Sequence, residues 1–350
     1  MSVVSHDTPR PPKQEQLPAT DAIDEVAPGI LRTQLPVHFP GLGHVNMYVL
    51  EDERGVAVVD PGLPDKASWK AIQQRLAQIG VPLKRVHTVI VTHSHPDHYG
   101  GARRLRSETG AQVVTDRRFH LWWDPREPVD IDPEEVIHVS PFSTPPWGGE
   151  AQRPMLRHGL RWRVVRRFPR LMPTVRPDVR LADAQTIRLA GREWVAVHTP
   201  GHTHDHLCLF DPTEGVLLSG DHVLPTITPH ISGLAQADSL TTYFSSLDKV
   251  AALGQATKVV LPAHGHPFHE LADRVADIHR HHEDRLARLS QALDALDRPA
   301  TVNEMSQHIF SPRAQGPMAD SETYAHLEHL RRLGGVERLE QHGLTHYVAA

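Results

Sequence analysis

Seven consecutive residues, Thr-His-Ser-His-Pro-Asp-His at positions 92–98, constrain this chain more than any other feature of its sequence. They directly follow the apolar run 86–91, which is typical of a buried strand in a parallel or mixed sheet. Alternation along an extended chain places the first two histidines on one side, and the proline turn carries the aspartate and the last histidine to a second position. A solvated loop in a chain with 27 histidines is the weaker alternative, because four ligand-type side chains at this spacing predict a site for two metals. The ligands expected here are His93, His95, Asp97 and His98.

Similar positions recur at the ends of later strands. His202 follows a Thr-Pro-Gly turn, Asp221 follows Ser-Gly, and His264 lies within Pro-Ala-His-Gly. The two oxygens of a carboxylate such as Asp221 can bridge two cations. Asp60, at the end of another strand, either holds a ligand histidine through its second ring nitrogen or only starts a turn. The neighbouring histidines of 202 are expected to support the site or face solvent; they are His198, His204 and His206.

Chain length predicts a main domain with a smaller one appended, because 350 residues exceed one average domain. We expect a disordered polar lead over residues 1–24, a catalytic domain over 25–268 and a C-terminal module over 269–350. Short strands alternate with amphipathic helices in the second part, which predicts an α/β fold. One such helix is expected over 64–80, and another over 99–110.

Charge and composition exclude several function classes. The formal net charge is −5 and the pI is near 6.6, which gives no support for a nucleic-acid or membrane partner. The single cysteine, Cys208, lies between two leucines and is expected to be a buried, inert thiol. No apolar stretch is long enough for a membrane span, and the first 20 residues resemble no signal peptide, so we expect a cytoplasmic protein.

Residues 117–180 interrupt the alternation of strands and helices and form an expected insertion. This segment contains four of the six tryptophans, and between positions 153 and 180 it has nine arginines against one acid. A lid with an apolar pocket and cations for an anionic substrate is one interpretation. A surface helix with a solvated basic face is the other, and the sequence favours neither.

The C-terminal module is expected to begin with a long polar helix over 270–297, in which His281 and His282 are surface residues. Two shorter helices, over 302–310 and 321–333, and an extended end over 336–348 suggest a winged-helix module. From 301 to 350 six acids face four arginines, and Glu322 and Glu328 lie on the helix that would enter a DNA groove. Nucleic-acid binding is therefore the weaker expectation, and packing or homodimerisation the stronger one.

Taken together, these motifs resemble the metallo-β-lactamase-fold hydrolases in order over residues 30–267, and no ligand position is missing. The module makes the chain look most like β-lactamase-like hydrolases that carry a C-terminal winged helix, with glyoxalase II a more distant relative. The resemblance implies an αβ/βα sandwich with the metals at one edge between two sheets. It further implies that Asp221 bridges two metals. The remaining ligands then divide into His93, His95 and His202 for one metal and Asp97, His98 and His264 for the other.

Imidazole and carboxylate ligands without thiolate suit two Zn²⁺ ions, although Fe or Mn is possible. Two such ions would generate a bridging hydroxide and polarise a carbonyl, so we expect hydrolysis of a carboxylic ester, thioester or lactone, a small acyl substrate that could be anionic. The alternatives are a nuclease or phosphodiesterase and an iron-dependent oxidoreductase of the same fold. The leaving group needs a proton donor, and spacing alone leaves three candidates open: Asp97, His222 and His230.

Overall fold

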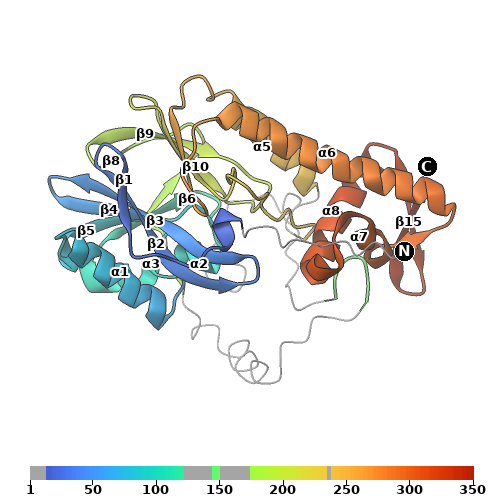
Figure 1. The fold of residues 1–350 in the computed structure, drawn as a ribbon, viewed down its shortest axis with the longest axis horizontal. Helices are drawn as coiled ribbons and strands as arrows, with labels where there is room; N and C mark the ends of the chain where they lie inside the picture. Colours follow the sequence, from blue (N-terminus) through green and yellow to red (C-terminus); the bar gives the residue numbers. More distant parts are fainter. Residues whose placement is uncertain (1–12, 122–143, 150–173, 235–237) are drawn as a thin grey trace, which may run out of the picture.

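The computed structural model describes residues 13–121, 144–149, 174–234 and 238–350. Two β-sheets form the centre of the larger part of the chain (Figure 1). The first sheet has seven strands in sequence order, an antiparallel meander (β1 to β4) followed by parallel strands (β4 to β7). Its strands are β1 (Ile23–Ala27), β2 (Ile30–Phe39), β3 (Leu42–Asp52), β4 (Gly55–Val59), β5 (Val86–Ile90), β6 (Gln112–Asp116) and β7 (Val179–Leu181).

The second sheet has five strands in the order β12-β11-β10-β9-β8, with β11 and β12 parallel and the other pairs antiparallel. Apolar side chains from both sheets meet in one buried cluster, which includes Tyr48 and Ile90 from the first sheet and Trp194 from the second. The two sheets therefore pack face to face. The strands of the second sheet are β8 (Thr186–Leu189), β9 (Arg192–His198), β10 (Leu207–Asp211), β11 (Val216–Gly220) and β12 (Val259–Pro262).

Helices cover the outer face of each sheet. On the first sheet these are α1 (Lys66–Gln78) and α3 (Ala102–Thr109), and on the second α5 (Ser239–Ala251) and α6 (Leu271–Leu296). Helix α1 begins at Asp65, whose carboxylate accepts a hydrogen bond from the Ser68 amide at 2.8 Å. The layers run helix, sheet, sheet, helix, which confirms the predicted αβ/βα sandwich.

The C-terminal part follows α6 and adds two helices and a small three-stranded sheet of order β13-β15-β14. Figure 1 shows α6 running from the outer face of the second sheet to these last helices. The helical content expected here is confirmed, with α8 beginning four residues earlier than expected. The elements are β13 (Ala300–Thr301), α7 (Val302–Ile309), α8 (Pro317–Arg332), β14 (Val336–Gln341) and β15 (Leu344–Ala349).

One expectation about the C-terminal part was wrong. His282 is fully buried, so it is not a surface residue, because it lies on the face of α6 that packs against α8. Glu322 and Glu328 are 6% and 8% exposed, so they do not present a carboxylate face to solvent. An arginine neutralises each carboxylate, Arg285 for Glu322 and Arg331 for Glu328.

The expected helix over 99–110 is divided into a short helix, α2 (Pro96–Tyr99), and α3. The division comes at Gly100 and Gly101, which lie against the loop after β4. A Cβ at Gly101 would lie 2.2 Å from the carbonyl oxygen of Pro61, so the helix passes this loop only without side chains.

The expectation of disorder was wrong for residues 13–24, which have a defined structure. Residues 1–12 lie outside the described part of the chain. Glu15 is fully buried and accepts hydrogen bonds from the amides of Thr226 and Ile227. Strand β1 is only five residues long, and no local pattern marks a buried carboxylate in a polar segment. The sequence therefore revealed neither feature.

Most of the predicted insertion, residues 122–143 and 150–173, lies outside the described residues, so the lid interpretation stays a prediction. In the described piece 144–149, Trp147 packs its ring against Tyr324 of α8, with ring centres 5.2 Å apart. The carbonyl of Trp147 accepts a hydrogen bond from the Thr345 amide. This piece of the insertion therefore contacts the C-terminal part.

Among the described residues, no helix is long and apolar enough to cross a membrane.

Candidate metal centre

All seven predicted metal ligands lie together at one edge of the sandwich. The first four follow β5, and the other three follow β9, β11 and β12. β11 and β12 are parallel neighbours in the second sheet, so both end at this edge, and β5 of the first sheet ends beside them. Both sheets contribute, so the centre bridges the two halves of the sandwich.

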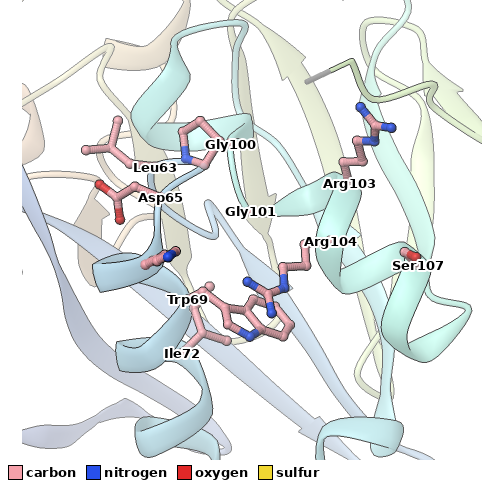
Figure 2. Close-up of a pocket in the computed structure, with 11 residues that line it drawn as sticks. Leu63, Asp65, Trp69, Ile72, Gly100, Gly101, Arg103, Arg104 and Ser107 are labelled. Carbon is pink, nitrogen blue, oxygen red and sulfur yellow. The ribbon is translucent and has the colours of Figure 1, made fainter. Parts of the chain in front are cut away.

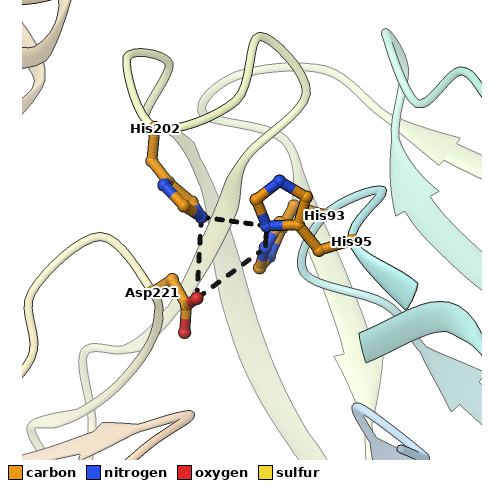
Figure 3. A group of neighbouring side chains, drawn as sticks. All are labelled: His93, His95, His202 and Asp221. Atoms are coloured by element: carbon orange, nitrogen blue, oxygen red, sulfur yellow. Dashed lines mark hydrogen bonds and ion pairs between the residues drawn. The ribbon is translucent and has the colours of Figure 1, made fainter. Parts of the chain in front are cut away.

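One group of four side chains is drawn in Figure 3: His93, His95, His202 and Asp221. Nδ1 of His95 lies 3.0 Å from Nε2 of His93 and 3.1 Å from Nε2 of His202. The Asp221 Oδ2 atom lies 3.9 Å from the His93 nitrogen and 3.6 Å from the His202 nitrogen. Three imidazole nitrogens and one carboxylate oxygen thus converge on a single point, which is the arrangement of a tetrahedral metal site.

A second group adjoins the first and consists of Asp97, His98 and His264. Asp97 Oδ2 lies 3.6 Å from Nε2 of both histidines. Asp221 reaches this group as well, with Oδ2 3.5 Å from His98 and Oδ1 3.3 Å from His264. A carboxylate within reach of both groups is placed to link two ions.

The donor set fits metal ions, as its orphaned polar atoms show. Nε2 of His98, Nε2 of His264 and Oδ1 of Asp221 are buried and have no hydrogen-bond partner among the described residues. Buried polar atoms without partners are costly, so three in one place, all aimed inward, fit the binding of a cation. These residues are able to hold metal ions.

The pKa values of the histidines differ between the two groups of the centre. Burial and the neighbouring imidazoles of His98 and His95 lower the pKa of His93 well below its usual value. Burial alone would also lower the pKa of His98, but the carboxylates around it, with Asp221 the strongest, raise it well above the usual value. Despite burial, the imidazoles of His264 and His98 hold the pKa of Asp221 well below its usual range. Neutral imidazole and ionised carboxylate are the forms that bind metals.

Asp60 supports the centre by holding a ligand histidine, which is one of the two roles that the sequence left open. Its Oδ2 accepts a hydrogen bond from Nδ1 of His98 at 2.8 Å, and from Oγ1 of Thr92 at 2.8 Å. The same carboxylate accepts the Thr92 amide through Oδ1. His98 is thereby fixed with its Nε2 toward the centre. Asp60 also has a positive φ of 53°, a conformation that aspartate and asparagine tolerate better than most residues.

Strand β3 supplies a support that the sequence did not reveal. Nδ1 of His264 lies 2.6 Å from the carbonyl oxygen of His44. Asn46 donates to the carbonyls of Pro262 and Gly265, so the His264 turn is held on both sides. The only local signal is a run of polar side chains at every second position of an otherwise apolar strand, including His44 and Asn46.

Of the three histidines around position 202, His206 has the clearest supporting role. It is fully buried, and its Nε2 accepts a hydrogen bond from the backbone amide of Asp221 at 3.0 Å. Its Nδ1 is paired with the Thr199 hydroxyl. His198 lies farther out and pairs with the carbonyl of His204.

The thiol of Cys208 is fully buried as expected, and burial raises its pKa to about 12.

The proton-donor candidates lie in different surroundings. His222 is fully buried beside Tyr243 and His206, and burial lowers its pKa to about 3. His230 keeps 23% of its side chain exposed, and its carbonyl accepts a hydrogen bond from Nδ1 of His202. Its Nδ1 lies 3.5 Å from Oε2 of Glu322, which connects this loop to helix α8.

A cavity of about 610 Å³ lies on the outer side of the first sheet, between α1 and α3 (Figure 2). The guanidinium of Arg104 stacks over the ring of Trp69, 4.1 Å from its centre. None of the residues lining this cavity is a candidate metal ligand. We therefore do not assign the metal-dependent chemistry to it.

Comparisons with known proteins agree with the geometry of the centre. The sequence model of the metallo-beta-lactamase superfamily matches residues 40–264, well over half of the chain. The chain is 23% identical over 314 residues to a probable metallo-hydrolase, YqjP, of Bacillus subtilis, with 85% of this chain and 91% of that protein covered. It is 28% identical over 216 residues to a hydroxyacylglutathione hydrolase of Albidiferax ferrireducens, covering 61% of this chain and 59% of that enzyme. An atrochrysone carboxyl ACP thioesterase of Passalora fulva is 25% identical, with 84% and 72% covered.

Solved structures of the same superfamily also resemble this chain. A metallo-beta-lactamase family protein from Thermus thermophilus superposes with a TM-score of 0.70 at 27% identity, covering 93% of this chain and all of that one. A beta-lactamase domain protein from Burkholderia ambifaria superposes with a TM-score of 0.72 at 26% identity, covering 95% and 96%. The matching region contains every candidate ligand of the centre. The chain therefore belongs to the metallo-beta-lactamase superfamily and is one of its metal-dependent hydrolases.

Proposed function

We propose that this protein is a binuclear hydrolase of acyl thioesters and related esters or lactones. The observation that supports it most strongly is the shared position of Asp221 between two complete ligand groups. In this proposal His93, His95 and His202 hold one metal, Asp97, His98 and His264 the other, and Asp221 bridges them. The metals, when bound, supply hydroxide at neutral pH and polarise the acyl carbonyl.

The residues of the chain hold and orient this centre. Asp60 and the His44 carbonyl fix the ring orientation of His98 and His264, and His206 holds the backbone of Asp221. Because these partners are themselves buried, the ligands are preorganised and need little rearrangement during the reaction. Two relatives, a hydroxyacylglutathione hydrolase and an atrochrysone carboxyl ACP thioesterase, favour a thioester among the acyl substrates.

Among the proton-donor candidates we propose His230. Its ring is partly exposed and near enough to His95 and His202 to lower their pKa values, whereas His222 is enclosed in the core. Replacing His230 by Gln should lower kcat for an alkyl ester about 100-fold and for an aryl ester far less, because an aryl oxide leaves without protonation. Equal losses on both esters would exclude His230 as the donor.

The decisive experiment combines metal analysis with a substrate screen. Purified protein is analysed for zinc, iron and manganese and then assayed on thioester, ester, lactone and phosphodiester substrates, with Asp221→Ala as the matched control. We expect thioester or ester hydrolysis that Asp221→Ala reduces by at least about 1,000-fold. Phosphodiester cleavage alone would favour a nuclease. Iron together with oxygen consumption would favour an oxidoreductase.

We further propose that residues 25–268 form the catalytic domain and that the C-terminal part is a winged-helix-like module used for packing or homodimerisation. Support comes from α8, whose buried face is turned to α6 and not outward. Sedimentation at several concentrations tests the dimer. A salt-sensitive shift of a DNA duplex at micromolar protein would contradict the packing role.

A further inference from the structure

A third group of metal-ligand side chains lies outside the centre, between α6 and α8. It consists of His282 on α6 and Glu322 and His326 on α8. The two α8 residues are four positions apart, so they share one face of the helix. His282 and His326 are fully buried and Glu322 is 6% exposed. Their ligand atoms all lie within 4.8 Å of one another, as those in each of the two groups of the centre do.

Two members of this group, His326 and Glu322, are oriented by a partner on the far side. His326 pairs its Nδ1 with the carbonyl of Glu322 at 2.7 Å, which leaves its Nε2 directed at His282. Arg285 donates to Oε1 of Glu322, and Oε2 lies 3.5 Å from Nδ1 of His230, so each oxygen keeps a further lone pair for an ion. A backbone carbonyl behind a histidine and a hydrogen bond behind a carboxylate are the usual outer partners of metal ligands.

The distance between the two imidazoles suits a common ion. Nδ1 of His282 lies 3.1 Å from Nε2 of His326, close to the separation of two nitrogens on a tetrahedral Zn²⁺, and the first group of the centre shows the same spacing. A hydrogen bond between two neutral imidazoles has a similar length, so the distance alone does not decide. The pair is accompanied by a third donor, because a carboxylate oxygen of Glu322 lies within 4.8 Å of both ligand nitrogens.

We propose that His282, Glu322 and His326 bind a third metal ion, Zn²⁺ or a similar borderline cation, which joins α6 to α8. Two imidazoles and one carboxylate match the ligand preference of Zn²⁺, and the enclosure of the group suits a structural ion. Burial keeps both imidazoles in the neutral form that binds metals, lowering the pKa of His326 to about 4 and that of His282 well below its usual value.

The position of this site gives it a link to the catalytic centre. Oε2 of Glu322 lies 3.5 Å from Nδ1 of His230, and the carbonyl of His230 accepts a hydrogen bond from His202. An ion here would therefore fix the helix that supports the His230 loop. The site uses none of the residues assigned to the centre, so the two proposals can fail separately.

Metal counting tests the proposal. The full chain is stripped with a chelator, incubated with excess Zn²⁺, desalted and analysed for zinc per chain. We expect three zinc ions in the wild type, one fewer in His326→Gln and one fewer in His282→Gln. The matched control is His329→Gln, which changes another buried imidazole of α8 that pairs with Thr241 instead, and it should keep all three.

His264→Ala separates the sites, because it should lose one ion from the centre and lose a second when combined with His326→Gln. A third zinc that remains in His326→Gln is bound adventitiously and overturns the proposal. If His326→Gln fails to fold, His282→Gln decides: one zinc fewer than in the wild type supports the site, and an unchanged count overturns it.

Discussion

At the scale of single residues, the ligand histidines use their two ring nitrogens for different purposes. One nitrogen faces the metal centre, and in His98, His202 and His264 the other is paired with a carboxylate or a backbone carbonyl. The tautomer and the ring angle are therefore set before a metal binds. Residues that never touch a metal should accordingly affect its affinity.

Replacing Asp60 by Asn tests this expectation. Asn keeps the size of the side chain and tolerates the positive φ, but it removes the charge that pairs with His98. We expect the dissociation constant of one metal to rise about 10- to 100-fold, measured by competition with a chromophoric chelator. Asp52→Asn is the control, because Asp52 pairs with His87 at the opposite end of β5. An unchanged affinity would show that Asp60 serves only the turn.

Asp116 is a buried carboxyl group that should make stability depend on pH. It is fully buried, Oδ2 has no hydrogen-bond partner among the described residues, and burial together with Asp205 raises its pKa from 3.8 to about 7. Between about pH 4 and pH 7 the unfolded chain releases this proton while the folded protein keeps it, so stability falls as pH rises and levels off above 7.

Asp116→Asn should therefore stabilise the protein at pH 8, by about 2 kcal/mol, and have little effect near pH 4. Asparagine cannot ionise, yet it can still accept the hydrogen bond from the Arg118 amide. Urea unfolding at both pH values measures the difference. A gain of equal size at pH 4 and pH 8 would mean that ionisation of Asp116 is not the cause.

At the scale of elements, the turns after the strands position the ligands, and each turn is fitted to a close neighbour. The turn before His202 contains Gly201, with a φ of 137° and a position against Tyr243 of α5. A Cβ at Gly201 would lie 2.5 Å from Cβ of Tyr243. Backbone conformation and packing thus both require glycine.

Gly201→Ala should lower the unfolding free energy by about 2 kcal/mol or more and reduce metal content, because α5 and the His202 turn cannot both keep their places. Gly191→Ala is the matched control, since Gly191 also has a positive φ of 71° but nothing within 4 Å of its missing Cβ. Urea unfolding and zinc analysis compare the two. Equal effects would show that positive φ matters here and the contact with Tyr243 does not.

At the scale of the whole molecule, the candidate metal centre connects the two sheets. The first sheet supplies His93, His95, Asp97 and His98, and the second supplies His202, Asp221 and His264. Three buried atoms at this junction, Nε2 of His98, Nε2 of His264 and Oδ1 of Asp221, have no hydrogen-bond partner among the described residues. Metal ions that bind only the folded chain should therefore stabilise the packing of one sheet on the other.

Chelation should lower the melting temperature by roughly 5–10 °C, since an ion at 100 times its dissociation constant contributes about 2.7 kcal/mol. Differential scanning calorimetry with and without chelator measures the shift, with residual metal checked by elemental analysis. Asp221→Ala should show a much smaller shift, because its centre is already impaired. Identical melting of metal-free and metal-loaded wild type would contradict a stabilising role.

Sequence alone identified the seven residues that come together as candidate ligands, because each lies in a short motif at the end of an apolar strand. A metal ligand must be held rigidly, and rigid placement leaves local marks such as Thr-Pro-Gly before His202 and Pro-Ala before His264. The alternation of strands and helices likewise predicted an α/β fold, since periodicity shows which face of each element is apolar, and the family resemblance implied the sandwich.

Tertiary structure decided which distant groups support those ligands. Nothing local pairs Asp60 with His98 or the His44 carbonyl with His264, because these contacts join strands far apart in the chain. His282 was expected on the surface for the same reason: a polar helix gives no sign that a second helix will cover part of it. Local sequence determines what an element can offer, and only packing decides what it meets.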